Sequence, residues 1–115
     1  MDHMTAPQLA AWIANPDRAA PVLLDVREIW EFDTARITGA TLVPMSTIVE
    51  RLDAVRALRA DSADAARSIV CICHHGARSM QVAAYLEKNG FDRIVNLTGG
   101  IHAWSQQVDA SVPVY

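Results

Sequence analysis

The residues with the clearest chemical potential form one uninterrupted segment. It consists of Cys73, His74, His75, Gly76, Ala77, Arg78 and Ser79. The segment starts at the last residue of an apolar run at 69–73 and ends in the first residues of a helical pattern that begins near Arg78. Such a turn, with Gly76 free to take a positive φ, can aim backbone N–H groups and the positive end of a helix dipole at one point. We therefore predict an anion-binding loop that holds Cys73 as a thiolate, the reactive form of cysteine.

An inert, buried side chain is the simplest alternative for each of the two cysteines. For Cys73, the glycine, the arginine and the helix start that follow it favour a functional role. Cys71 lies two residues earlier on the same face of the predicted strand, and we expect it to pack in the core. A strained disulfide with Cys73, or a resolving role, is the alternative for Cys71.

Four side chains of zinc-ligand type lie together here: Cys71, Cys73, His74 and His75. Structural zinc sites usually draw two ligand pairs that are separated along the chain. A second pair is missing from this sequence unless His102 joins, so we expect no metal at the segment.

Strands that alternate with helices are predicted to position the loop. Short apolar runs typical of buried strands occur at 22–26, 41–43, 69–73 and 94–97. Helical patterns run from the capping residue Thr5 to Asn15, from a cap at Ser46 to Arg59, from about Arg78 to Gly90, and over 101–108. We interpret 27–40 as a loop with one helical turn at most, and 61–67 as a surface connection. This alternation implies an open, mostly parallel α/β sheet with its functional sites at the carboxyl ends of the strands.

Asp25 is the anomaly of the run 22–26, because a strand buried on both faces rarely carries a charge. Buried polar groups are nearly always hydrogen-bonded. We therefore interpret Asp25 as an acceptor that organises the following loop together with Arg27, so that both are supporting residues of the site. A catalytic role for Asp25 is the less favoured alternative.

Length and composition limit the class of protein. The 115 residues are 51% hydrophobic and 20% charged, which fits one globular domain over 1–115 and excludes a disordered chain. Residues 1–4 are expected to be disordered or foreign to the native chain. The net charge of -3 with scattered basic residues argues against a nucleic-acid partner. The apolar runs are too short for a membrane helix or a secretory signal, so we expect a cytoplasmic protein.

Four ordered motifs span the chain. They are LDVRE at 24–28 with WEF at 30–32, ITGA at 37–40, the segment at 73–79, and LTGGIHAW at 97–104. With these motifs the chain resembles the single-domain rhodaneses of the sulfurtransferase family. The resemblance covers about the whole chain and implies a three-layer α/β fold, in which helices flank a mostly parallel sheet of about five strands.

The resemblance also implies a mechanism. Cys73 would take a sulfane sulfur from thiosulfate or a persulfide donor, store it as a persulfide, and pass it to cyanide, a thiol or an acceptor protein. The backbone of 74–79 would cradle the sulfur, Arg78 would give electrostatic support, and no cofactor is implied. A partner-dependent sulfur carrier with little multiple turnover is the alternative from another functional class.

The loop departs from related chemistries in two ways. Four residues separate Cys73 from Arg78, whereas the similar cysteine phosphatases use a longer loop to enclose phosphate, so a phosphatase is disfavoured. Rhodanese loops efficient with thiosulfate often carry permanent cations, whereas this loop has His74 and His75, which are only partly charged at neutral pH. We therefore predict weak thiosulfate turnover that rises as the pH falls toward about 6.

Overall fold

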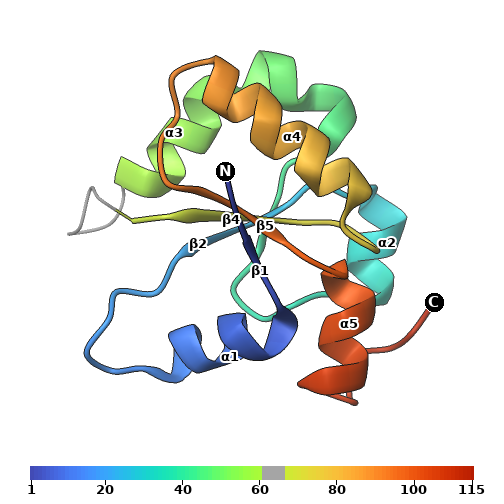
Figure 1. Ribbon diagram of the computed structural model, residues 1–115. Coiled ribbons are helices and arrows are strands. Elements are labelled where there is room, and N and C mark those ends of the chain that lie inside the picture. Colours follow the sequence, from blue (N-terminus) through green and yellow to red (C-terminus); the bar gives the residue numbers. More distant parts are fainter. Residues whose placement is uncertain (61–66) are drawn as a thin grey trace.

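A five-stranded, fully parallel sheet lies at the centre of the computed structural model, which describes residues 1–60 and 67–115 (Figure 1). Its strands are β1 (Asp2–Met4), β2 (Val22–Asp25), β3 (Thr41–Leu42), β4 (Ile69–Ile72) and β5 (Ile94–Leu97). Their spatial order is β1-β5-β4-β2-β3. Helical segments are α1 (Ala6–Ala14), α2 (Ile29–Thr34), the 3₁₀ helix η1 (Met45–Arg51), α3 (Leu52–Ala60), α4 (Ala77–Lys88) and α5 (Gly100–Gln107).

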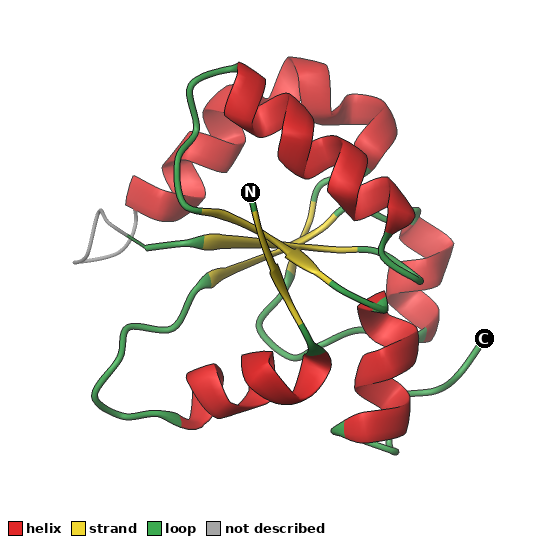
Figure 2. Cartoon of the chain, viewed as in Figure 1, coloured by secondary structure: helices red, strands yellow, loops and turns green. Residues whose placement is uncertain are grey.

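Helices cover both faces of the sheet and produce three layers (Figure 2). On one face, side chains from η1, α3 and α4 pack against β2, β4 and β5 around Val55, Val82 and Leu86. On the other face, α1 and α5 pack against the same strands through Leu9 and Ile101. Every residue of β2, β4 and β5 is buried, which explains why these strands are nearly continuous apolar runs. The three-layer α/β prediction is confirmed.

The strand β1 was not expected from the sequence. Residues 1–4 were predicted to lie outside the fold, whereas Asp2–Met4 pairs in parallel with β5, and Met4 packs against the core. The carbonyl of Met4 also accepts a hydrogen bond of 2.8 Å from the N–H of Thr98. Three residues with one apolar side chain give no periodic signal, so only the tertiary pairing reveals this edge strand.

Two helical segments differ from the prediction. The interval 27–40 contains α2, a longer helix than the single turn expected, and the Glu31 side chain caps it by accepting a 3.0 Å hydrogen bond from the N–H of Glu28. The helix predicted from Ser46 instead starts as η1 after Pro44 and becomes α3 only at Leu52. The prediction of Ser46 as its cap is wrong, because Pro44 occupies that position and no side chain caps it.

The predicted start of α1 and the predicted end of α4 are confirmed. Thr5 and Gln8 form the reciprocal capping box at the start of α1, and Gly90, with φ +88°, follows the last turn of α4. The surface connection predicted at 61–67 lies outside the described residues, except for Arg67. Among the described helices, none is both long and apolar enough to cross a membrane.

Candidate active site

The loop at 73–79 lies where β4 ends and α4 begins, so the predicted strand, loop and helix occur in that order. Cys73 is buried, and its Sγ accepts a hydrogen bond of 3.0 Å from the N–H of Gly76. Gly76 has φ +111°, and a Cβ there would lie 3.3 Å from the Gly99 nitrogen. The turn that brings an N–H back onto the sulfur therefore depends on a glycine. The first-turn N–H groups of α4 have no acceptor within the helix and point toward its N-terminal end, where the loop lies.

A buried serine and asparagine complete the surroundings of the sulfur. Ser79 Oγ lies 3.2 Å from Cys73 Sγ and donates a 2.6 Å hydrogen bond to Asn96 Oδ1. Asn96, on β5, also donates from Nδ2 to the carbonyl of Gly76 at 3.3 Å. Asn96 was missed as a site residue, although a polar residue inside the apolar run 94–97 is the same signal that singled out Asp25.

The start of α5 is bonded directly to the loop. The N–H of Ile101 donates to the carbonyl of Cys73 at 2.9 Å, and the N–H of His102 donates to the carbonyl of His74 at 3.1 Å. Gly100 has φ +58°, and a Cβ there would collide with both carbonyl oxygens. The sequence predicted only a turn at this glycine, but the structure shows that its lack of a side chain lets α5 and the loop meet.

Asp25 and Arg27 form a fully buried ion pair at the end of β2. Asp25 accepts from the Arg27 N–H at 3.1 Å and from its guanidinium at 2.7 to 3.1 Å. The remaining guanidinium donors reach the carbonyl of Ala35 at 2.6 Å, the carbonyl of Glu31 at 3.2 Å and Tyr115 Oη at 2.8 Å. Asp25 thus organises the start of the segment that follows β2, as its position in the sequence suggested. Among the described residues, the hydrogen-bond partners of Cys73 Sγ are Gly76 and Ser79, so Asp25 and Arg27 support the loop without a hydrogen bond to the sulfur.

Arg78 points its guanidinium at a protein partner. It forms a bidentate pair with Glu31, with distances of 2.6 and 2.8 Å, and Tyr115 Oη donates to the same carboxylate at 2.8 Å. The hydrogen bonds from Arg78 outweigh burial and lower the pKa of Glu31 to about 2, while Glu31 raises the pKa of Arg78. The positive charge predicted to support the loop is therefore largely offset by Glu31.

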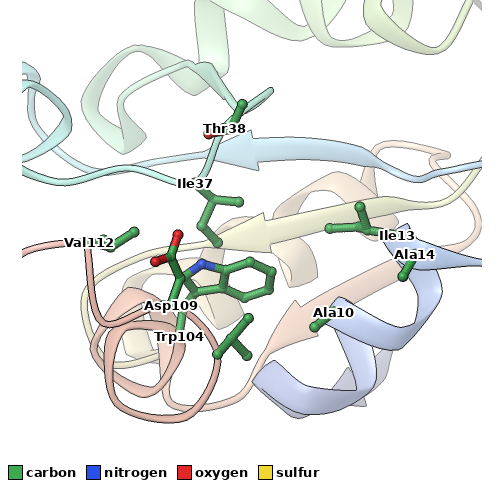
Figure 3. A pocket seen from close by; sticks show the side chains of 9 residues that line it. Ala10, Ile13, Ala14, Ile37, Thr38, Trp104, Asp109 and Val112 are labelled. Carbon is green, nitrogen blue, oxygen red and sulfur yellow. The ribbon is translucent and has the colours of Figure 1, made fainter.

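The loop borders a small cavity of about 190 Å³, lined by Cys73, His74, His75, Ala77 and Arg78. A larger apolar cavity of about 320 Å³ lies elsewhere, between α1 and α5 (Figure 3). None of the loop residues lines that second cavity, and its walls are mainly alkyl groups and the Trp104 ring. The small cavity beside Cys73 is thus the candidate active site.

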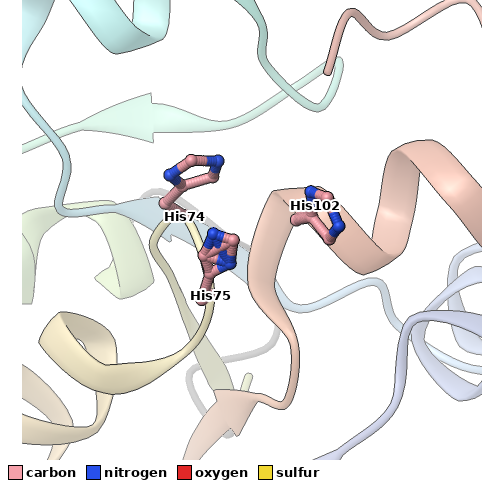
Figure 4. Close-up of side chains that lie close together, drawn as sticks. All are labelled: His74, His75 and His102. Atoms are coloured by element: carbon pink, nitrogen blue, oxygen red, sulfur yellow. The ribbon is translucent and has the colours of Figure 1, made fainter. Parts of the chain in front are cut away.

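Three histidines gather at the loop (Figure 4). The ring of His75 lies 4.0 Å from that of His74 and 4.9 Å from that of His102, measured between centroids. His74 also stacks on Tyr115, with centroids 4.0 Å apart. Burial and the neighbouring His75 lower the pKa of His74. This shift works against the predicted rise of turnover at lower pH, because His74 charges less readily than a free histidine.

Cys71 lies in the core and not at the site. It is fully buried among the residues that pack under α3 and α4, and burial raises the pKa of its thiol to about 12. Both cysteines are free. The prediction of core packing for Cys71 is confirmed, and the alternative of a disulfide with Cys73 does not occur in this structure.

The sequence and the fold both match those of known proteins. The sequence profile of the Rhodanese-like domain matches residues 5–107. The chain belongs to this family. A solved structure of a rhodanese-like domain protein from Staphylococcus aureus is 30% identical, with a TM-score of 0.77, and the match covers 100% of this chain and 99% of that one.

Two curated relatives of this rhodanese-like chain are longer proteins. Adenylyltransferase and sulfurtransferase MOCS3-2 of Zea mays is 33% identical over 94 residues, which are 82% of this chain and 19% of the relative. The tRNA uridine(34) hydroxylase of Xanthomonas oryzae pv. oryzae is 33% identical over 108 residues, 91% of this chain and 42% of the relative. The chain therefore spans about a fifth to two fifths of the length of these relatives.

Proposed function

We propose that this rhodanese-like protein is a sulfurtransferase that carries a sulfane sulfur on Cys73. The observation that carries the proposal is the position of Cys73 Sγ at the start of α4. This sulfur accepts a hydrogen bond of 3.0 Å from the Gly76 N–H and lies 3.2 Å from the Ser79 hydroxyl. The Gly76 N–H and the N-terminus of α4 place partial positive charge beside this sulfur, which suits a negatively charged nucleophile or persulfide. The name of the maize relative, a sulfurtransferase, supports the same chemistry.

The first step loads the cysteine. The Cys73 thiolate attacks the outer sulfur of thiosulfate, a new S–S bond forms, and the old S–S bond breaks so that sulfite leaves with the bonding electrons. With a persulfide donor, a thiolate leaves in place of sulfite. The outer sulfur then lies in the small cavity, where N–H groups of 74–79 stabilise its negative charge.

The second step unloads the cysteine. A nucleophile attacks the outer sulfur, and the Cys73 thiolate leaves and is regenerated. Cyanide would give thiocyanate, a small thiol would give a persulfide, and a protein acceptor would receive the sulfur on its own nucleophile. We place this reaction in the cytoplasm, where the reducing thiol pool keeps cysteines free.

The charge balance at the site favours persulfides over thiosulfate as donors. The Arg78 guanidinium is paired with Glu31, and His74 has a lowered pKa, so the loop offers little permanent charge to a dianion. A persulfide carries less charge and needs less compensation. We expect transfer from a low-molecular-weight persulfide to be faster than transfer from thiosulfate.

A steady-state assay tests the proposal. Thiocyanate formation from thiosulfate and cyanide, and sulfur transfer from a persulfide, are measured for the natural protein, Cys73→Ser and Cys71→Ser. We expect Cys73→Ser to fall to the uncatalysed rate, because it lacks the nucleophile, and Cys71→Ser, the matched control, to keep its rate within about threefold. Equal rates for Cys73→Ser and the natural protein would overturn the proposal.

The same assay separates the two alternatives. A phosphatase would release phosphate from an aryl phosphate in a Cys73-dependent manner, and we expect no such release. A partner-dependent carrier would complete one turnover per chain and then stop, whereas a sulfurtransferase continues to turn over. Release of phosphate, or a single burst with both donors, would replace the proposed activity by the corresponding alternative.

A further inference from the structure

We propose that His74, His75 and His102 bind a first-row divalent cation, Zn²⁺ in the first instance, through one imidazole nitrogen each. One candidate ligand nitrogen from each residue lies within 4.8 Å of the other two. Figure 4 shows the three rings facing a common space between the loop and the first turn of α5. Three neutral imidazoles form a known type of zinc site, in which the fourth position stays open to water or another ligand.

This proposal revises the expectation of no metal, which depended on the lack of ligands from a second part of the chain. The fold supplies that ligand, because His102 lies on α5, which is bonded to the loop. The revised set omits both cysteines. Cys71 is buried in the core, and the Sγ of Cys73 already contacts Gly76 and Ser79.

Two of the imidazoles keep a nitrogen that is available to a ligand, and His74 in addition has a hydrogen bond with the backbone of Tyr115. Within the described part of the chain, His74 Nε2 and His102 Nδ1 are buried nitrogens without a hydrogen-bond partner. Buried polar nitrogens nearly always have a partner, so two in one cluster require an explanation. Coordination of a cation by this cluster gives the rings a polar partner that the protein does not supply.

The backbone that carries the ligands is already fixed. Hydrogen bonds of 2.9 and 3.1 Å join the start of α5 to the carbonyls of Cys73 and His74, and Gly100 permits this close approach. Zinc–nitrogen distances of about 2.0–2.1 Å place ligand nitrogens about 3.3 Å apart in a tetrahedron. The widest separation of ring centroids, 6.1 Å, is between His74 and His102, so these two side chains, as well as exposed His75, must rotate to bring the nitrogens to this spacing.

A bound cation would also change the electrostatics of the loop. The charge of Arg78 is offset by Glu31 at 2.6 Å, so a cation on the three histidines adds positive charge beside the Cys73 cavity. The binding itself does not depend on sulfur transfer, so it is tested in a Cys73→Ser background, where the active-site thiolate cannot capture the ion.

The test is calorimetric titration of the 115-residue Cys73→Ser protein with Zn²⁺, followed by the same titration of variants that also carry His75→Ala, His102→Ala or His3→Ala. His3 is the matched control, because it is the fourth histidine of the sequence and lies exposed on β1. Circular dichroism verifies the fold of each variant, and exposed His75 keeps the test valid if His102→Ala unfolds.

We expect saturable binding of one Zn²⁺ per chain, weakened about tenfold or more by His75→Ala and by His102→Ala and unchanged by His3→Ala. Zn²⁺ should raise the melting temperature of the Cys73→Ser protein but not that of its His75→Ala derivative. Lack of saturable binding, or equal affinity with and without His75, would overturn the proposal. Neither result bears on the sulfurtransferase proposal, which is tested separately by the steady-state assay.

Discussion

At the residue scale, we propose that the contact between Ser79 and Cys73 raises the reactivity of the sulfur. The Ser79 hydroxyl lies 3.2 Å from Sγ and donates to Asn96 Oδ1 at 2.6 Å, so it stabilises a thiolate when it turns from Asn96 to donate to the sulfur. A hydrogen bond to a charged group contributes about 1.5 kcal/mol or more. We expect Ser79→Ala to slow alkylation of Cys73 by iodoacetamide at pH 7 about tenfold. Ser105→Ala removes another buried helical serine, whose hydroxyl donates to the carbonyl of Ile101 in its own helix at 3.0 Å, and should leave the rate unchanged. Mass spectrometry of the alkylated protein measures both rates, and an unaffected Ser79→Ala would contradict the assigned role.

At the scale of elements, the packing of α5 on the loop is the feature on which the site depends. Gly100→Ala would place a Cβ against the carbonyl oxygens of Cys73 and His74, and we expect it to separate the two segments and abolish most sulfur transfer. Gly90→Ala is the matched control, because Gly90 also has a positive φ, but its Cβ position has no non-neighbouring atom of the described residues within 4 Å. That variant should lose about 1–2 kcal/mol of unfolding free energy from backbone strain alone and keep its activity. Chemical denaturation and persulfide transfer measure the two effects, and an active Gly100→Ala variant would show that the contact is dispensable.

The elements also show what the sequence could predict. Buried strands such as β4 and the helix α4 carry strong local signals, an apolar run and a helical pattern closed by Gly90, and both were predicted. The edge strand β1 depends on its pairing with β5, and the 3₁₀ segment begins at Met45, whose N–H bonds the distant carbonyl of Val26; neither was predicted. Cys73 and its loop were found from one contiguous segment. Asn96 and the partnership of His102 with the loop come from β5 and α5, so only the fold brings them to the site.

At the scale of the whole molecule, a partly buried polar network ties the end of β2, α2, α4 and Tyr115 together. Glu31 lies at its centre, and Arg78 lowers the pKa of Glu31 from 4.5 to about 2. A carboxyl whose pKa is lower in the folded state stabilises the fold above its unfolded pKa and loses this contribution as the pH falls through the folded value. We expect Glu31→Gln to lower the unfolding free energy at pH 7 by about 1–3 kcal/mol and to flatten its decline between pH 4.5 and about 2. Exposed Glu50 supplies the control variant Glu50→Gln. Urea denaturation across this pH range gives both values, and a steep decline that persists in Glu31→Gln would assign the acid sensitivity to other groups.

The most direct test of the central claim is the intact mass of the protein after incubation with a low-molecular-weight persulfide and, separately, with thiosulfate. The proposed mechanism predicts the mass of one added sulfur atom on the natural protein and on Cys71→Ser, its removal by cyanide or a thiol, and no addition to Cys73→Ser. The persulfide should load a larger fraction of the chains than thiosulfate, because the charge of Arg78 is already paired with Glu31. An adduct that persists in Cys73→Ser, or no adduct from either donor, would contradict the account.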